Sequence, residues 1–550
     1  MRAKLLFGIL TILVFAAMPL RAQTLDSIAL AIADRVQDND GRWADAGDER
    51  QIALINGYDA AGYKPIWVDA NGMTAKGQAL IAMLQASDQD GLHASDYLTP
   101  ELKDAMAASD PSALANLDVV LSFTLLNYAH HIGAGRVEPS AINSDLRISP
   151  EGPDLEATLA TARSASDMAA FAASIAPSAP RYQRLKQGLA KYREIVAAGG
   201  WVQVPGPQTG KSLKPGMIDP MVPVLARRMV QANQLAEADY DFATGPELYE
   251  GAIVDAVKRF QNSLALEIDG VIGPNTLKQI NITAEQRVKQ LEVNLERRRW
   301  MPDDLGNYYV FVNLADQYLK VVKKVEKNGK LREKTLHAAR TVVGKTYHKT
   351  PVFTELMTYM VLNPNWNVPY SIATREYLPK LKANPGALQR QNIRVLSGGR
   401  KISPFAVNWS AYSRGNFPFR LQQASGPKNA LGRVKFMFPN KYNIYIHDTP
   451  SKSLFKKASR VFSHGCVRVQ DPLKLAEVIL GPEGVGRSKI DGIINRGKRR
   501  VVKLKTPIPV HITYLTAWVN KDGSVHFRRD VYGRDAILEK ALGRVQVASN

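Results

Sequence analysis

Cysteine is nearly absent from this sequence, in which Cys466 is the single thiol among 550 residues. One cysteine cannot form a disulfide within the chain, so a disulfide-stabilised fold is excluded. Long apolar runs are also scarce: the one at residues 5–18 is shorter than the roughly 20 residues that a membrane span needs, and no later run is longer. Acidic residues are outnumbered, with 51 Asp and Glu against 72 Lys and Arg, which gives a formal net charge of +21. Because 45% of the residues are hydrophobic, an ordinary globular value, a disordered chain is excluded as well.

The first residues have the pattern of a secretory signal peptide. Arg2 and Lys4 precede the apolar run, and small residues at 19–22 follow it. We therefore expect residues 1–22 to be a cleavable signal and the mature protein to be exported, with an uncleaved anchor as the alternative. In an exported protein, the positive charge favours an anionic partner such as a cell-wall polymer or a lipid headgroup over nucleic acid.

The length predicts about three or four domains. The first is helical, because apolar residues recur at helical spacing, as in the stripe of Leu117, Leu121 and Leu125. The neighbouring His130 and His131 point in different directions on a helix, so a structural or surface role is favoured over a metal site. The expected boundaries are a signal peptide at 1–22, a helical scaffold domain at 23–215, a small module at 216–282, a connecting helix at 283–303, a mainly-β domain at 304–515 with an insert at about 370–427, and a C-terminal tail at 516–550.

The small module has the sequence pattern of a three-helix fold. Ile253, Val257 and Phe260 fall at helical spacing. An Asp-Gly turn follows at 269–270, and Gly-Pro at 273–274 opens another helix with proline at its first position. The order AVKRFQ and then DGVIGPNTL resembles the peptidoglycan-binding module of cell-wall enzymes. Any small helical bundle is the alternative.

After a charged helix expected at 284–299, apolar and polar residues alternate, which indicates β-strands. The stretch between about 369 and 427 breaks this pattern, with one short helical segment near 375–382. A stretch that long inside a compact domain usually carries function or forms a flap over a site. The alternation predicts strands at 309–314, 318–325, 338–343, 358–362, 434–438, 442–447 and 510–515.

Chemically active residue types concentrate in HDTP at 447–450 and SHGCVRV at 463–469. A thiol is mostly protonated near neutral pH, so a nucleophilic Cys466 needs a base beside it. His447, at the end of a predicted strand, can serve if the two strands are neighbours, and His464 is the weaker candidate. Gly465 lets the main chain turn so that N–H groups point at one spot, an oxyanion hole for acyl transfer.

Three other roles are open to this cysteine. A zinc site of His447, His464 and Cys466 has suitable ligand types but no fourth ligand at a usual spacing. A redox thiol lacks a second cysteine as its partner. An inert buried cysteine does not account for the glycine, histidines and arginine around it. A nucleophilic cysteine is therefore the favoured role.

Fifteen residues separate His447 from Ser463, and the two segments together resemble the signature of the L,D-transpeptidase catalytic domain, also called the YkuD domain. The resemblance extends to GK at 344–345, TP at 350–351, NPNWNVP at 363–369 and GPKNALG at 426–432. The helical region, the module and the tail look like the large YcbB-type members. The resemblance implies a multidomain α+β chain whose catalytic domain is mainly β, sandwich-like, and carries a capping insert.

This resemblance implies Cys466 as the acylated nucleophile and His447 as its base, oriented by the main-chain carbonyl of Asp448. A Cys-His-Asp triad through the Asp448 side chain stays open. Neither a metal nor another cofactor is implied, and carbapenems are implied as acylating inhibitors because they mimic the acyl donor.

The residues around the cysteine are implied to bind substrate. Main-chain N–H groups of His464, Gly465 and Cys466 would form the oxyanion hole. Arg468 would hold the loop or meet a substrate carboxylate, and Ser463 belongs to the same substrate-binding set.

The implied reaction takes place on peptidoglycan in the periplasm. The cysteine would form a thioester with diaminopimelate of a donor tetrapeptide, release D-Ala, and pass the acyl group to a diaminopimelate amine to make a 3-3 crosslink. With water as acceptor the enzyme would be an L,D-carboxypeptidase, and with the amine of an outer-membrane protein it would anchor that protein to the wall. A catalytically idle wall-binding scaffold is the alternative from another class.

Overall fold

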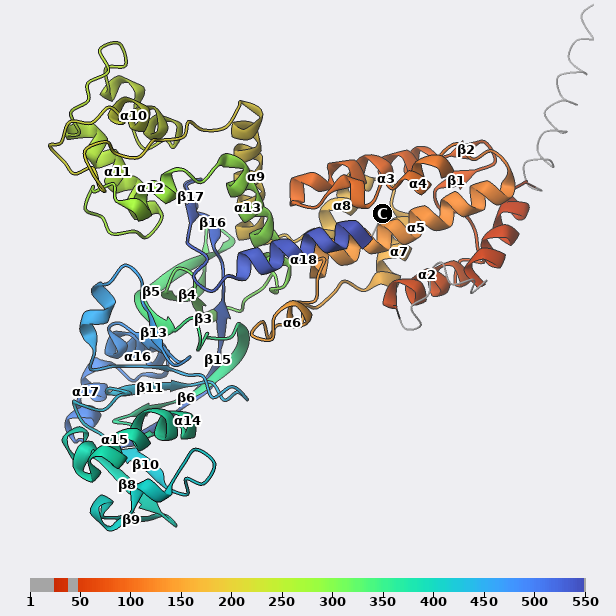
Figure 1. The fold of residues 1–550 in the computed structure, drawn as a ribbon. Coiled ribbons are helices and arrows are strands. Elements are labelled where there is room, and N and C mark those ends of the chain that lie inside the picture. The colour runs from red at the N-terminus through yellow and green to blue at the C-terminus, as the bar shows by residue number, and fades with distance from the viewer. Residues whose placement is uncertain (1–23, 38–47, 549–550) are drawn as a thin grey trace, which may run out of the picture.

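The computed structural model describes residues 24–37 and 48–548, and the expected signal peptide at 1–22 lies outside these residues. A helical body, a small helical module and a β-rich domain surround the central helices α9 (Pro180–Ala197) and α13 (Ala284–Arg299) (Figure 1). Within the described ranges, every helix is too short or too polar to cross a membrane.

The helical body is organised around α5 (Pro111–Ala134), which begins at the N-cap Asp110 with proline at its first position. Leu117, Leu121 and Leu125 are fully buried, as the helical spacing predicts. The buried Asp118 accepts hydrogen bonds from the main-chain N–H groups of three consecutive residues at 66–68 and so holds that loop. The other elements are α2 (Glu49–Asp59), α3 (Ala75–Gln85), α4 (Pro100–Ala105), α6 (Pro139–Ile142), α7 (Leu155–Ser164), α8 (Met168–Ile175) and the short hairpin of β1 (Val68–Asp69) and β2 (Gly72–Met73).

The small module has three helices, as expected from its sequence. The residues at helical spacing, Ile253, Val257 and Phe260, are buried on one face of the second helix. The Asp-Gly turn is fixed by Gln261, whose side-chain oxygen accepts from the N–H of Gly270 at 2.9 Å. The helices are α10 (Val222–Gln231), α11 (Gly251–Ser263) and α12 (Pro274–Ile280).

The β-rich domain is built on one nine-stranded sheet in the order β13-β5-β14-β12-β11-β6-β15-β3-β4. The long β5 also pairs with β4, so the sheet closes on itself around a core in which Val310, Phe436 and Val467 are fully buried. The elements are β3 (Tyr308–Asn313), β4 (Tyr318–Lys327), β5 (Lys330–Gly344), β6 (Phe353–Leu362), β11 (Val434–Met437), β12 (Ile446–His447), β13 (Val461–Ser463), β14 (Val467–Val469), α16 (Pro472–Leu480), α17 (Arg487–Asn495) and β15 (Arg500–Thr513).

One expected strand is much shorter than its sequence pattern. Alternation predicts a strand over 442–447, but only Ile446–His447 pair as β12. The preceding residues form a turn, because the Asn440 side chain accepts from the N–H groups of Tyr442 and Ile444, and Asn443 has φ 56°.

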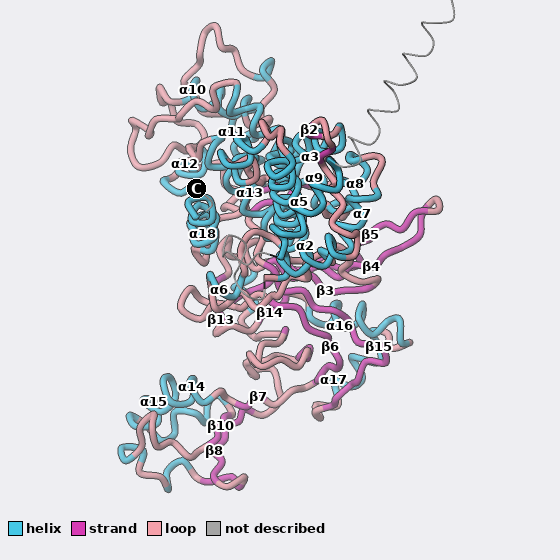
Figure 2. Tube along the Cα trace, turned by 90° about the vertical axis from the view of Figure 1, so that its right-hand side faces the viewer, coloured by secondary structure: helices cyan, strands magenta, loops and turns pink. Residues whose placement is uncertain are grey.

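The insert after β6 folds as a unit with its own core. Leu381, Trp409 and Leu421 are buried in it, and Figure 2 shows it extending from the sheet beyond β7. Its elements are β7 (Trp366–Asn367), α14 (Tyr370–Ile372), α15 (Leu378–Ala383), β8 (Ile393–Ser397), β9 (Arg400–Ile402) and β10 (Arg420–Gln423), with strand order β7-β10-β8-β9.

Helix α13 joins the parts of the chain. It begins with a capping box between Thr283 and Gln286. The buried Glu296 accepts from the N–H of Arg136 in the helical body at 2.6 Å, and Asn294 accepts from the N–H of Thr516 in the tail at 2.8 Å. The tail contains β16 (Ala517–Val519), β17 (Val525–Phe527) and α18 (Arg534–Ala548).

Candidate active site

Five chemically active side chains share one face of three neighbouring strands. Lys435 on β11 pairs with His447 on β12, which in turn pairs with Arg468 on β14. Alternate residues of a strand point to the same face, so Tyr445 lies on the face of His447, and Cys466 on the face of Arg468. The main-chain N–H of residue 467 donates to the Tyr445 carbonyl at 3.1 Å, which sets these two strands side by side. Pairing of strands thus places the thiol and the imidazole on the same surface.

The opposite face of the same strands explains why this register is fixed. Phe436, Ile446 and Val467 are all fully buried there. A shift of one residue would exchange the two faces and expose these apolar side chains. The core therefore holds the polar side chains at the surface of the sheet.

His447 is held as a neutral imidazole. Its Nδ1 lies 2.5 Å from the main-chain oxygen of Asp448. Because a carbonyl can only accept, Nδ1 carries the proton, which leaves Nε2 with a lone pair. Burial, followed by the charge of Arg468, lowers the pKa of His447 to about 3, while the hydrogen bond to Asp448 opposes the shift. Near neutral pH this side chain can accept a proton but carries no charge.

The carboxylate of Asp448 is engaged away from the imidazole. It accepts from the N–H of Arg433 at 2.7 Å and from the N–H of Thr449 at 2.6 Å, and it is paired with Lys452. Gly432 makes room for it, since a Cβ there would lie 2.2 Å from the carboxylate and the residue has φ 59°. The imidazole is thus oriented by the main chain, while the Asp448 side chain orders the adjoining loop.

Cys466 is half-buried, and its thiol donates to the main-chain oxygen of Asn443 at 3.6 Å. Burial raises the pKa of the Cys466 thiol, and Tyr445, Lys435 and, less strongly, Arg468 partly offset this effect. The resting arrangement is therefore a neutral thiol on the same face as a neutral imidazole. Such a thiol needs a base to become nucleophilic.

The loop before the cysteine is tied by a short chain of hydrogen bonds. Gly465 has φ 114°, a conformation that favours glycine. Its N–H donates to the Ser463 hydroxyl at 3.1 Å, and that hydroxyl donates to the carbonyl of Cys466 at 2.6 Å. The Thr350 hydroxyl donates to the carbonyl of Gly465 at 2.7 Å. Since the Gly465 N–H is engaged in this way, the N–H groups of His464 and Cys466 remain as the candidates for an oxyanion hole.

His464 contacts the insert. Its Nε2 lies 2.6 Å from a carboxylate oxygen of Glu376, and its ring lies 5.2 Å from that of His348. This imidazole is therefore occupied at the edge of the site, and His447 is the candidate base.

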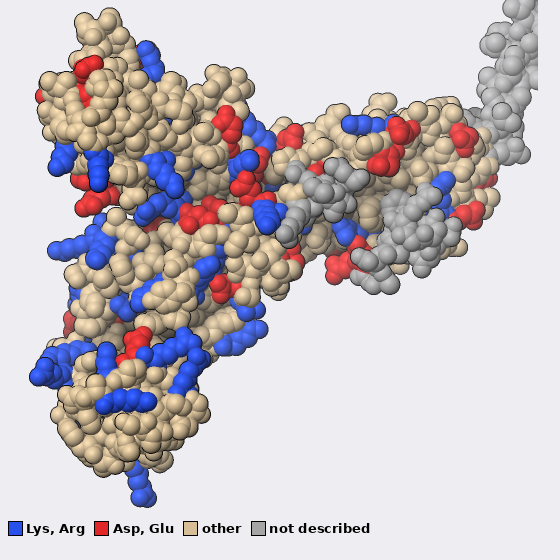
Figure 3. Space-filling model, viewed as in Figure 1, with Lys and Arg blue, Asp and Glu red and all other residues tan. Residues whose placement is uncertain are grey.

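A cavity of about 260 Å³ lies between the insert and the strands of the site. The insert side contributes Tyr377 and Arg390, the segment returning from it contributes Lys428, and the sheet contributes Thr449 and Arg468. On the face shown in Figure 3, Lys and Arg side chains gather over the insert and the adjoining β-rich domain. Arg390, Lys428 and Arg468 give the cavity a basic lining that can bind carboxylates.

The sequence analysis assigned no role in the site to Lys435, Tyr445 or Thr350, although Thr350 belongs to the TP pattern of the resemblance. Lys435 lies with its ammonium 3.8 Å from the Tyr445 ring centroid, and Thr350 ties the cysteine loop. Strand geometry was the available signal for Lys435 and Tyr445. Lys435 is the cross-strand partner of His447, and Tyr445 lies two positions before His447 on the same face. Within the described residues, no group of three or more His, Cys, Asp and Glu side chains could hold a metal ion.

Comparison with known families assigns three parts of the chain. Residues 307–510 match the L,D-transpeptidase catalytic domain (YkuD), residues 228–280 match the "Putative peptidoglycan binding domain", and residues 53–189 match a scaffold domain. A protein of Haemophilus influenzae named "Putative L,D-transpeptidase" is 32% identical over 267 residues, which cover 48% of this chain and 51% of that protein. The chain thus matches about half the length of this curated relative.

Two solved structures also show similarity. An L,D-transpeptidase from Xylanimonas cellulosilytica covers 56% of this chain and 99% of its own at 13% identity, with a TM-score of 0.16. A fused Zn-dependent amidase/peptidase/peptidoglycan-binding domain-containing protein from Clostridium acetobutylicum covers 55% of this chain and 99% of its own at 11% identity, with a TM-score of 0.15. The family matches and the curated relative show that the chain contains an L,D-transpeptidase catalytic domain, together with a scaffold domain and a peptidoglycan-binding domain.

Proposed function

We propose that this protein is a periplasmic L,D-transpeptidase that crosslinks peptidoglycan stem peptides. The observation that carries the proposal is the strand register, in which Cys466 and His447 share one face of adjacent strands with Arg468, and Arg468 also lines a basic cavity. The peptidoglycan-binding domain in the same chain supports the choice of polymer.

In the acylation step, the Cys466 sulfur attacks the carbonyl carbon at the L-centre of diaminopimelate in a donor tetrapeptide. His447 Nε2 accepts the thiol proton, and the carbonyl oxygen becomes an oxyanion that main-chain N–H groups of the cysteine loop stabilise. The bond from this carbon to the nitrogen of D-Ala then breaks, and the imidazolium returns the proton to the leaving amine. The products are free D-Ala and a thioester on Cys466.

In the second step, an amine attacks the thioester carbonyl and expels the thiolate, which recovers a proton through His447. When the amine is the side chain of another diaminopimelate, the product is a 3-3 crosslink. Water in place of the amine gives a tripeptide, and an amine of an outer-membrane protein gives a protein–wall bond. The basic cavity favours a peptide acceptor, because such an acceptor carries carboxylates that Arg390, Lys428 and Arg468 can bind.

Intact-protein mass spectrometry with a disaccharide-tetrapeptide tests the proposal. We expect a covalent adduct on the wild type that lacks D-Ala, no adduct on Cys466→Ala, and a dimer with a 3-3 bond among the products. Lys474→Ala, on an exposed position of α16, is the matched control and should form the same adduct.

The other outcomes are informative. An adduct that yields only tripeptide would replace transpeptidation with L,D-carboxypeptidase activity or a missing protein acceptor. The absence of an adduct with both tetrapeptide and a carbapenem, under reducing conditions, would refute Cys466 as nucleophile and favour the wall-binding scaffold.

A further inference from the structure

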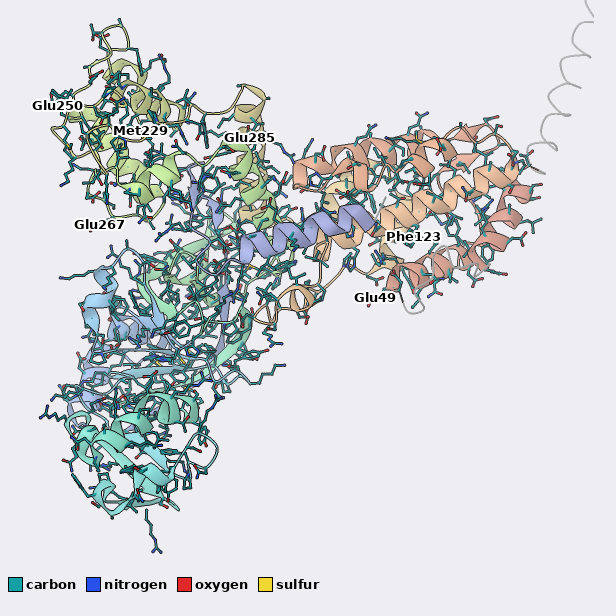
Figure 4. All side chains as sticks on the ribbon, in the orientation of Figure 1. Glu49, Phe123, Met229, Glu250, Glu267 and Glu285 are labelled. Atoms are coloured by element: carbon teal, nitrogen blue, oxygen red, sulfur yellow. The ribbon has the colours of Figure 1, made fainter. Side chains whose placement is uncertain are left out.

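A second cavity, of about 200 Å³, is lined by none of the residues of the cysteine site. It lies where the peptidoglycan-binding domain meets α9, α13 and the β16–β17 hairpin. Figure 1 shows this hairpin between the module and the central helices, and Figure 4 marks Met229 on α10 and Glu285 on α13, the elements on two of its sides. Three basic side chains, Lys191, Arg228 and Arg287, line it. None of the described side chains that line it is acidic.

Arg228 is the main polar group of this cavity. Its side chain is only 2% exposed, and its Nε donates to the carbonyl of Ile280 at 3.1 Å. Its guanidinium lies over the Trp201 ring at 4.0 Å from the centroid. Among the described residues, Arg228 Nη1 and Trp201 Nε1 are both buried without a hydrogen-bond partner. Two donors therefore lie close together with nothing to accept from them.

Arg287 adds a second buried cation. It is 4% exposed, donates to the side-chain oxygen of Gln290 at 2.8 Å, and lies over the Phe527 ring at 4.4 Å. Within the described part of the chain, neither arginine forms an ion pair with a carboxylate. Burial, together with the charge of Arg287, lowers the pKa of Arg228 to about 10, whereas Tyr192 opposes the shift.

Two buried cations without a counter-ion are costly, because desolvation is compensated only when an anion with good geometry is present. A carboxylate fits the donors, since a guanidinium N–H and a neighbouring indole N–H can each meet one oxygen. The aromatic rings of Trp201, Phe260 and Phe527 offer apolar surface to the rest of a small ligand. A cavity of about 200 Å³ admits an amino-acid residue at the end of a chain and excludes a folded partner.

We propose that this cavity binds a carboxylate of a peptidoglycan stem peptide. This inference rests on the proposed function for the identity of the polymer, because α10 and α11, which form one wall, belong to the peptidoglycan-binding domain. The cavity shares no lining residue with the cavity beside the cysteine site. Binding there would fix the module against the scaffold and the tail while the polymer is engaged.

Hydrogen–deuterium exchange of the full-length Cys466→Ala protein tests the proposal, because it reads the cavity separately from the catalytic site. The probe is the stem tetrapeptide with free carboxylates, compared with the same peptide fully amidated. We expect the free acid to protect residues 191–201 and 523–527, and the amide to need at least tenfold more peptide for the same protection.

Variants locate the effect. Arg228→Gln should need at least tenfold more free-acid peptide than the Cys466→Ala parent for the same protection. Arg227→Gln should need the same amount as the parent, because Arg227 is on the exposed side of the same helix with its side chain 45% exposed. Arg228→Lys keeps the charge and should retain weaker binding, and a melting curve of each variant without ligand identifies any that fail to fold.

Three outcomes would overturn the proposal: equal protection by acid and amide, full protection of a folded Arg228→Gln, or saturation by inorganic phosphate that the peptide does not displace. The last result would mean an adventitious ion only. Adduct formation on wild-type Cys466 is measured in parallel, so that a failure of this site is distinguished from a failure of the proposed enzyme.

Discussion

Thr350 offers a sharp test of how the cysteine loop is held. Its side chain is fully buried, and its hydroxyl joins two main-chain groups: it accepts from the N–H of Gly344 at 3.0 Å and donates to the carbonyl of Gly465 at 2.7 Å. Thr350→Val keeps the shape and leaves both groups unsatisfied. Each buried polar group without a partner costs about 1 to 3 kcal/mol, so the expected loss is roughly 2 to 6 kcal/mol.

The loss should appear in both stability and rate. A domain of this size loses about 2 to 4 °C of melting temperature per kcal/mol, so the transition of the catalytic domain should fall by roughly 4 to 24 °C. Release of the Gly465 carbonyl also frees the loop that carries Cys466, and kcat should fall by about tenfold or more. The measurements are a melting curve and the rate of tetrapeptide acylation by mass spectrometry.

Thr350→Ser is the matched control, because it keeps the hydroxyl and loses only a methyl group. It should retain the wild-type rate within a small factor. If Thr350→Val melts within about 2 °C of the wild type and acylates at the same rate, the reasoning about this hydroxyl is refuted.

Three further predictions follow from buried or strained positions. Gly344→Ala should destabilise the protein by about 1 to 3 kcal/mol, because a Cβ there would lie 2.1 Å from the His348 carbonyl oxygen, whereas Gly481→Ala has open space and should be neutral in the same urea titration. Cys466 should react with iodoacetamide more slowly than a free thiol at pH 7.5, and the rate should rise with pH toward the thiol's raised pKa; a plateau below pH 7 would instead show a thiolate–imidazolium pair. Asp118→Asn should lower the free energy of unfolding by about 2 to 4 kcal/mol, because Oδ2 accepts from the N–H groups at 66–68 and an amide NH2 in place of Oδ1 could not accept from the Tyr58 hydroxyl or the Ile66 N–H; an unchanged denaturant midpoint would contradict this.

The sequence pattern predicted an element correctly where the contacts that form it lie between residues close together in the sequence. The charged helix expected at 284–299 is α13 (Ala284–Arg299), because its capping box and its apolar spacing are contained within the segment. The strand expected at 442–447 was too long, since alternation cannot show that the Asn440 side chain captures the N–H groups of the next residues and forms a turn.

The candidate site shows the same division. Cys466 and His447 could be named from the sequence because the chemistry of a thiol and an imidazole, and the glycine beside them, are visible in two short segments. Lys435 could not, because strand pairing brings it to the site, and Thr350 was visible only as part of a family pattern, because its role depends on a hydrogen bond across 115 residues.

The sequence by itself determined the residue types for acyl transfer, the helical and β-rich regions, and the resemblance to a family, because these depend on local composition and spacing. Only the tertiary structure decided which face of the sheet carries the site, that the Asp448 carboxylate is engaged by the adjoining loop and not by His447, and that Arg228 and Arg287 meet in one cavity. The physical reason is that burial and hydrogen bonding are satisfied between segments far apart in the chain, and no local pattern records those partners.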